Sequence, residues 1–207
     1  MTEKHIFLIR HGETEFNKQG IIQGCGIDSD LNETGRKQAL AFFEHYKNQP
    51  FNKIYVSTLK RTWQTVEPFL SKGIPIEKHA GLNEISWGKF EGTNMKDSPQ
   101  FHFEKLIHAW RNGETNLAVG GGESPEDVAE RQKPVLDLIF SRTEEKNILI
   151  CMHGRAMRIF LCQLFRIPLK EMDRFLHANT ALYHLIYDYK TDSIYAHAEN
   201  CLKHLEM

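Results

Sequence analysis

The sequence predicts an α/β protein built as a three-layer α/β/α sandwich, with a mostly parallel central sheet, an antiparallel edge strand and a small helical insertion over the site. Strand-like and helix-like segments alternate along most of the 207 residues, which is typical of a parallel sheet covered by helices on both faces. The last two strand-like segments follow one another across a short turn, which is typical of an antiparallel edge. The length suits one domain, so residues 1–207 are expected to form it, with the insertion at 93–122.

The first half of the chain contains three strand-like segments and two helix-like segments. Residues 6–9 are four consecutive apolar residues, as expected of a strand buried on both faces. Residues 31–46 have helical apolar spacing, with Asn32 in the position of an N-cap. A strand follows at 53–57, and a proline in the short strand at 73–79 places that segment at an edge. The helix between these two strands is expected to bury one side, formed by Leu59, Trp63, Val66 and Leu70.

The second half opens with the helical excursion at 93–122, in which apolar side chains recur at helical spacing before a glycine-rich return. A helix is expected at 124–140, because Ser124 suits an N-cap and Pro125 suits the first helical position. Another helix is expected directly after the strand at 148–152, which is the most apolar of the predicted strands. Three strand-like segments complete the pattern: 148–152, 181–189 and 193–199.

Composition and charge exclude several classes of protein. The 26 basic and 27 acidic residues give a formal net charge of −1, so no global basic field attracts nucleic acid or an anionic membrane. No segment approaches the about 20 consecutive apolar residues of a membrane span. The chain starts without the layout of a signal peptide, and its four cysteines show no CxxC spacing. We therefore expect a cytoplasmic protein with reduced thiols, no nucleic-acid or membrane partner, and a monomeric or homodimeric state.

Polar and charged side chains follow three of the predicted strands. Arg10 and His11 end the first strand, Arg61 comes shortly after the second, and His153 and Gly154 end the strand at 148–152. Ligands of open α/β sheets bind beyond the carboxyl ends of the strands. If these strands are parallel neighbours, two imidazoles and two guanidinium groups meet at one edge.

This edge is expected to bind a compact anion, of which phosphate is the leading candidate. Arg61 lies in the first turn of a helix, where the macrodipole disfavours a cation unless an anion is bound. Gly154 allows a tight turn into a helix whose N-terminal N–H groups would be free to bind the same anion. A metal site is not expected, because guanidinium groups would repel the cation and no Asp or Cys accompanies His11 or His153 in a ligand pattern.

The stretch "LIRHGETEFN" resembles the signature of the histidine phosphatase superfamily, also called the phosphoglycerate mutase-like family. Further segments resemble that family in the expected order, so the resemblance runs from residue 6 to about residue 158. These segments are "DLNETGRKQA", "VSTLKRTWQT", "LNEISWGKFEG", "GGGESPEDVAER" and "MHGRAMR". The ordered set is far more specific than the RHG tripeptide alone.

The resemblance implies a role for each matching residue. His11 would be the nucleophile that forms a phosphohistidine, and Glu84 would be the acid that protonates the leaving oxygen. The phosphate pocket would be completed by Arg10, Asn17, Arg61 and His153, and no metal or organic cofactor is implied. A neutral imidazole suits this chemistry because it attacks phosphorus without bringing negative charge toward an anion.

The resemblance leaves the reaction open between a phosphatase and a mutase. A mutase must hold a phosphoglycerate carboxylate, which calls for extra cations beside the acid, yet Glu84 is followed by Ile85, Ser86 and Trp87. We therefore expect the phosphatase branch, which includes fructose-2,6-bisphosphatase-like and alpha-ribazole phosphatase-like enzymes, acting on a small phosphomonoester. A phosphoglycerate mutase is the alternative, and a non-catalytic module that binds a phosphorylated ligand is a remote one.

The insertion carries an aromatic stripe that has two readings. Its side chains are either part of the core or, with Phe16, the lining of a lid that selects the leaving group. The residues concerned are Phe101, His102, Phe103 and Trp110. The sequence favours the core reading, because a stripe at helical spacing is more often buried.

Overall fold

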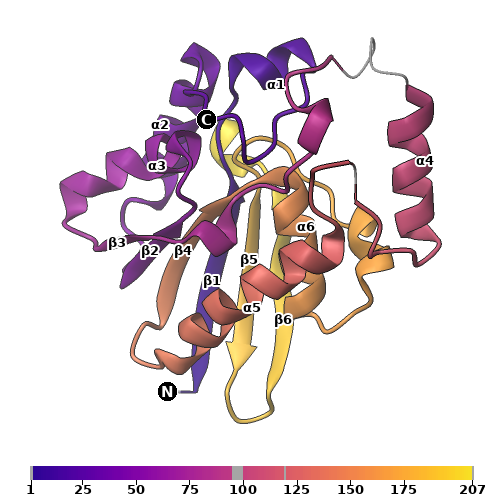
Figure 1. Cartoon of the computed structure of the whole chain (residues 1–207). Helices are drawn as coiled ribbons and strands as arrows, with labels where there is room; N and C mark the ends of the chain where they lie inside the picture. The colour runs from indigo at the N-terminus through magenta and orange to yellow at the C-terminus, as the bar shows by residue number, and fades with distance from the viewer. Residues whose placement is uncertain (1, 95–99, 119, 207) are drawn as a thin grey trace.

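In the computed structural model, which describes residues 2–94, 100–118 and 120–206, the described strands form one six-stranded sheet between two layers of helices (Figure 1). The strand order is β3-β2-β4-β1-β5-β6, and the first four strands of that order are parallel. β5 runs antiparallel to both of its neighbours. The predicted fold class, including the antiparallel strand near the edge, is therefore confirmed. The strands are β1 (Glu3–Arg10), β2 (Lys53–Val56), β3 (Ile76–Lys78), β4 (Asn147–Met152), β5 (Leu182–Asp188) and β6 (Ser193–Cys201).

The helices divide between the two faces of the sheet (Figure 1). Side chains alternate along β1, so Ile6 and Leu8 pack toward α5 and α6, whereas Phe7 and Ile9 pack toward α2 and α3. The α-helices are α1 (Glu15–Gln19), α2 (Glu33–Tyr46), α3 (Lys60–Val66), α4 (Gln100–Arg111), α5 (Pro125–Ser141) and α6 (Gly154–Leu164). Short 3-10 helices occupy Glu67–Lys72, Ala80–Leu82, Gly88–Phe90, Leu169–Arg174 and Lys203–Leu205. Among the described residues, no helix is both long and apolar enough to span a membrane.

The predicted caps of two helices are present. Asn32 accepts a hydrogen bond from the N–H of Gly35 at the start of α2. Ser124 and Asp127 form a reciprocal capping box at the start of α5, where Pro125 takes the first helical position. Both helices begin where side-chain oxygens satisfy backbone donors that have no partner inside the helix.

The prediction for the helix after β2 was wrong at its end. α3 stops at Val66 and a 3-10 helix follows, so Leu70 is exposed (46%) while Phe69 is buried. Pro68 lies at the start of that 3-10 helix. The tighter winding of a 3-10 helix changes which side chain faces the sheet.

The insertion contains α4, which lies to one side of the sheet (Figure 1). Trp110 on α4 is buried, donates its Nε1–H to the carbonyl of Leu117, and lies 5.8 Å from Trp87 between ring centroids. For Trp110, therefore, the core reading holds. Residues 95–99 and 119 of the insertion, and the side chains of Phe101 and His102, lie outside the described residues.

Candidate functional site

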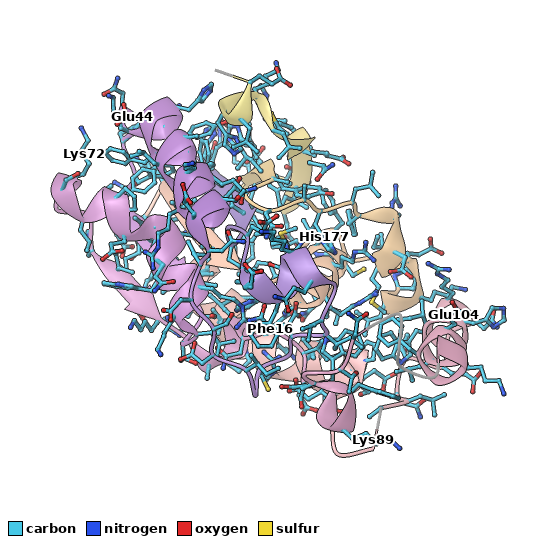
Figure 2. All side chains as sticks on the ribbon, turned by 90° about the horizontal axis from the view of Figure 1, so that it is seen from above. Phe16, Glu44, Lys72, Lys89, Glu104 and His177 are labelled. Carbon is cyan, nitrogen blue, oxygen red and sulfur yellow. The ribbon has the colours of Figure 1, made fainter. Side chains whose placement is uncertain are left out.

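The sheet register brings the ends of β1, β2 and β4 together. Arg10 of β1 pairs with Met152 of β4, and His11 and His153 come directly after these two residues. Their ring centroids lie 5.1 Å apart. Viewed from above, α1 (labelled at Phe16) and the segment of His177 lie near the middle of the molecule, over this edge (Figure 2).

A cavity of about 300 Å³ opens at this edge. Five of the seven site residues expected from the sequence line it: Arg10, His11, Asn17, Glu84 and Gly154. The other lining residues are Ile21, Ile22, Gln23, Trp87, Phe103, Arg155, Arg158 and His177. The lining is therefore partly cationic and partly apolar.

His11 is held as a neutral imidazole with a defined tautomer. Its Nδ1 lies 2.7 Å from the carbonyl oxygen of Gly12. Because a carbonyl only accepts, Nδ1 carries the proton and Nε2 keeps the lone pair. Burial, followed by the positive charges of Arg61 and Arg10, lowers the pKa of His11 well below its ordinary value. Nε2 is therefore available as a nucleophile at neutral pH.

Arg10 keeps donor capacity beside His11. Its Nη1 donates to Nδ1 of His177 at 3.3 Å, whereas its buried Nε has no hydrogen-bond partner among the residues that the structure describes. Burial and the cations Arg10, Arg158 and Arg155 lower the pKa of His177 to about 3, so this ring stays neutral and can accept. A Cβ at Gly154 would lie 2.9 Å from a carbon of the His177 ring. Only glycine at this position allows the ring to approach so closely.

Arg61 and His153 lie behind the cavity wall. Both are fully buried, and neither is among the residues that line the cavity. The Nε–H of Arg61 donates to Nδ1 of His153 at 3.1 Å, and its Nη1 donates to the carbonyl of Ile27 at 2.7 Å. His153 therefore donates from Nε2 to Ser57 Oγ, 2.8 Å away. Burial and the Arg61 charge lower the pKa of His153 well below its ordinary value. The structure brings this pair next to His11, with both imidazole nitrogens of His153 bound to protein groups.

The side chain of Glu84 lies at the N-terminus of α6, which contradicts one expectation about the amides of that helix. Its Oε1 accepts from the N–H groups of Ile85 and Ala156, at 2.9 and 2.8 Å, and its Oε2 accepts from the N–H of Arg155 at 3.1 Å. The amides of Arg155 and Ala156 were expected to be free for an anionic ligand, and that expectation was wrong. A helix N-terminus attracts any nearby carboxylate, and the chain supplies its own.

Asn17 is oriented by its neighbours on and beyond α1. Its Oδ1 accepts from the N–H of Thr14 at 3.2 Å and from Nδ2 of Asn179 at 3.3 Å. Asn179 also donates to the carbonyl of His11 at 3.0 Å. Since Oδ1 is committed, the amide N–H groups are what Asn17 can offer to a ligand in the cavity.

Four polar residues of the cavity were missed by sequence reasoning: Gln23, Arg155, Arg158 and His177. Arg155 and Arg158 lie one helical turn apart on α6, and both form ion pairs with Asp173, which also pairs with Arg111 of α4. Their spacing in "MHGRAMR" could have placed them on one face of the helix. His177 follows a 3-10 helix in an irregular segment, where no periodic signal exists.

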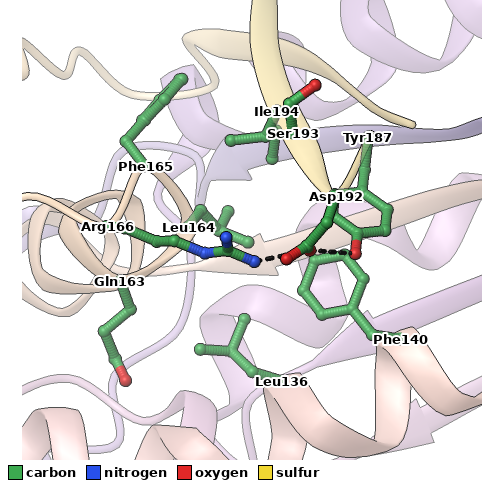
Figure 3. A pocket seen from close by; sticks show the side chains of 10 residues that line it. All are labelled: Leu136, Phe140, Gln163, Leu164, Phe165, Arg166, Tyr187, Asp192, Ser193 and Ile194. Carbon is green, nitrogen blue, oxygen red and sulfur yellow. Dashed lines mark hydrogen bonds and ion pairs between the residues drawn. The ribbon is translucent and has the colours of Figure 1, made fainter. Parts of the chain in front are cut away.

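A second cavity, of about 400 Å³, lies elsewhere, between α5, α6 and the β5–β6 hairpin (Figure 3). Its charged groups are already paired, because Asp192 binds both Arg166 and the Tyr187 hydroxyl. No nucleophilic nitrogen lines it. Within the described part of the chain, no cluster of three or more His, Cys, Asp or Glu side chains could hold a metal ion.

Comparison with known proteins agrees with this geometry. Residues 6–200 match the model of the histidine phosphatase superfamily (branch 1). Human 6-phosphofructo-2-kinase/fructose-2,6-bisphosphatase 1 is 31% identical over 211 residues, which cover 100% of this chain but 43% of that protein. The chain thus spans less than half the length of this relative.

Two further relatives cover most of both chains. The 2,3-bisphosphoglycerate-dependent phosphoglycerate mutase of Bradyrhizobium diazoefficiens is 31% identical over 175 residues, covering 81% of this chain and 84% of the mutase. The solved structure of a mycobacterial glucosyl-3-phosphoglycerate phosphatase superposes with a TM-score of 0.80 at 25% identity, covering 96% of this chain and 99% of that one. The similar proteins therefore include both phosphatases and a mutase.

Proposed function

Because this chain belongs to the histidine phosphatase superfamily (branch 1), we propose that it hydrolyses a small phosphomonoester through a phosphohistidine at His11. One observation carries the proposal: a neutral, buried His11 whose Nε2 keeps its lone pair lines the same cavity as Arg10, whose buried Nε has no hydrogen-bond partner among the described residues. A nucleophilic nitrogen next to an unsatisfied guanidinium donor suits a phosphoryl group.

In the first step, Nε2 of His11 attacks phosphorus, the N–P bond forms and the P–O bond to the leaving group breaks. Arg10 and the amide of Asn17 stabilise charge on the phosphoryl oxygens. Glu84, protonated at the start, gives its proton to the leaving oxygen. The Gly12 carbonyl accepts the Nδ1–H of His11 and so stabilises the positive charge that the ring gains.

In the second step, water attacks the phosphohistidine. Glu84 now accepts a proton from that water, the N–P bond breaks, and inorganic phosphate leaves. His11 and Glu84 return to their starting states, so the cycle needs no cofactor. Arg61 contributes positive charge from behind the wall, and the neutral His153, bound to Arg61 and Ser57, holds the ends of β2 and β4 in place.

A phosphoglycerate mutase is the second candidate, favoured by the similarity to the Bradyrhizobium enzyme. Its substrate carboxylate would need free cations beside Glu84. The two cations of α6 that line the cavity, Arg155 and Arg158, are both paired with Asp173. That pairing favours hydrolysis over transfer back to a phosphoglycerate.

The cavity also supports a proposal for the substrate class. A volume of about 300 Å³ suits a phosphate with a small organic group. The apolar side chains of the lining suit a leaving group with an apolar or ring portion; they are Ile21, Ile22, Trp87 and Phe103. We propose such a phosphorylated metabolite, in a cytoplasmic setting that fits four unpaired cysteines.

The test is release of phosphate from p-nitrophenyl phosphate in EDTA, with the wild-type chain and with His11→Ala. We expect activity in the wild type, at least ~10³-fold less in the variant, and no loss in the surface control His45→Ala. Acid-labile, base-stable phosphate should be trapped on the wild type alone. Undiminished activity in His11→Ala would refute the proposal. Efficient conversion of 3-phosphoglycerate to 2-phosphoglycerate with 2,3-bisphosphoglycerate would instead favour the mutase.

A further inference from the structure

Arg131 of α5 lies outside the cavity, yet its side chain binds the segment that carries Glu84. We propose that Arg131 is a positioning residue for Glu84, an inference that rests on the proposed function. Residues 84–87 belong to no helix or strand, so no ladder of backbone hydrogen bonds fixes them. The position of the acid relative to His11 must be set by other contacts.

The guanidinium of Arg131 supplies those contacts on the N-terminal side of the acid. Its Nη1 donates to the carbonyl of Gly81 at 2.8 Å, and its Nη2 donates to the carbonyls of Asn83 and Glu84, at 3.0 and 3.1 Å. A planar group with five fixed donors can satisfy several carbonyls at once, which a lysine cannot do.

The same guanidinium reaches the C-terminal side of the acid through Glu123. Arg131 Nε donates to Glu123 Oε1 at 2.7 Å, and Glu123 Oε2 accepts from the N–H of Ser86 at 2.8 Å. The N–H of Glu123 also donates to the carbonyl of Ser86 at 2.9 Å. Arg131 and Glu123 therefore hold the backbone on both sides of Glu84.

The side-chain carboxyl group of Glu84 is also linked to α5, through Ala156 and Gln132. The N–H of Ala156 donates to Glu84 Oε1, and the carbonyl of Ala156 accepts from Nε2 of Gln132 at 2.8 Å. Gln132 is the neighbour of Arg131 on α5. Two neighbouring residues of α5 thus position the acid. Arg131 binds the backbone of Glu84, and Gln132 binds Ala156, which in turn donates to the carboxyl group of Glu84.

The experiment compares Arg131→Lys with the wild type on substrates whose leaving groups differ in basicity. An alkyl phosphate needs a proton on its leaving oxygen, whereas 2,4-dinitrophenyl phosphate does not. We expect kcat/KM for glycerol phosphate to fall by about 10²-fold, the low end of the range for general acid catalysis. We expect kcat/KM for the dinitrophenyl ester to fall by less than ~3-fold. The comparison uses kcat/KM because kcat also contains the second step, in which Glu84 accepts a proton from water whatever the leaving group. The slope of log(kcat/KM) against leaving-group pKa should steepen toward that of Glu84→Gln.

Arg142→Lys is the matched control, because Arg142 caps the other end of α5 and pairs with Glu77 away from the cavity. It should leave the slope unchanged, even if the melting temperature falls. Glu123→Gln weakens the contacts that join Arg131 to the backbone of Ser86. This variant replaces Arg131→Lys if Arg131→Lys fails to fold. An equal loss on both substrates, or no loss at all, overturns the role of Arg131 provided that Glu84→Gln remains selective for the alkyl ester. If Glu84→Gln is itself unselective, the proposed function fails instead.

Discussion

The Nε–H of Arg61 donates a hydrogen bond to Nδ1 of His153 at 3.1 Å, with both side chains fully buried behind the wall of the cavity. This bond fixes the tautomer of His153, which then donates from Nε2 to Ser57. Two further donors of Arg61 bind the carbonyls of Ile27 and Gly24. Arg61 therefore holds a loop and an imidazole in place, in addition to carrying charge near His11.

Arg61→Lys is expected to lower both activity and stability. Lysine keeps the charge but cannot reach three acceptors, so buried acceptors lose their partners. We expect kcat/KM to fall by about 10²-fold and the free energy of unfolding by about 1–3 kcal/mol. Phosphatase kinetics and urea unfolding measure the two effects. The exposed Arg36→Lys on α2 is the control, and a variant with unchanged kcat/KM would contradict the role given to Arg61.

The tautomer and charge of His11 can be observed directly. Burial and the two arginines lower the pKa of His11 well below 6.5, so the free enzyme should hold its ring neutral from pH 8 to below pH 6.5. An NMR titration of the imidazole nitrogens should report a protonated Nδ1 and a lone pair on Nε2 throughout that range. A titration midpoint at or above 6.5 would mean that the ring is protonated when the reaction begins.

Stability should fall as the solution becomes acidic. The pKa is lowered to about 3 for His177 and to about 4 for His184 and His204, in each case mainly by burial. Above pH 6.5 these rings are neutral in both the folded and the unfolded chain. Below it the unfolded chain binds protons that the folded chain does not, so the free energy of unfolding decreases from pH 6.5 toward about 4.

Urea unfolding at several pH values between 4.5 and 7.5 measures this slope. His204→Asn removes one of the contributing groups far from the cavity and should flatten the slope. A free energy of unfolding that stays constant or rises on acidification would show that these histidines are not held neutral in the fold.

Asp173→Asn should release three arginines at once. Arg155, Arg158 and Arg111 all pair with Asp173, so its loss leaves uncompensated positive charge beside the cavity. We expect inhibition by 2,3-bisphosphoglycerate to strengthen by about 10-fold at low salt, the equivalent of 1.4 kcal/mol, whereas inhibition by inorganic phosphate changes little. The inhibition constants at two salt concentrations provide the measurement. Equal strengthening for both anions would place the released charge at His11 rather than beside it.

Local signals in the sequence predicted the parts of the fold that depend on neighbouring residues. Four consecutive apolar residues predicted β1, and the N-cap residues Asn32 and Ser124 predicted the starts of α2 and α5. The alternating pattern predicted a mostly parallel sheet, and the structure adds that β1 and β4 are neighbours in it, which brings His11 close to His153.

Contacts between distant segments could not be predicted in the same way. The carboxylate of Glu84 accepts from an amide 72 residues away, and no pattern around Glu84 encodes this partner. His177 reaches Arg10 from an irregular segment, 167 residues along the chain. The exposure of Leu70 follows from a local change of helix type after Val66, which apolar spacing alone does not reveal.

The carboxyl group of Glu84, which is proposed to deliver the proton, also caps the N-terminus of α6. Glu84 accepts two amides of the first turn of α6, and an ionised carboxylate binds such donors more strongly than a neutral one. In the proposed cycle, each turnover would therefore tighten and then relax this turn, which carries Arg155 in the lining of the cavity. Bond breaking at phosphorus would then be coupled, through the Glu84 side chain, to the strength of the hydrogen bonds at the start of α6.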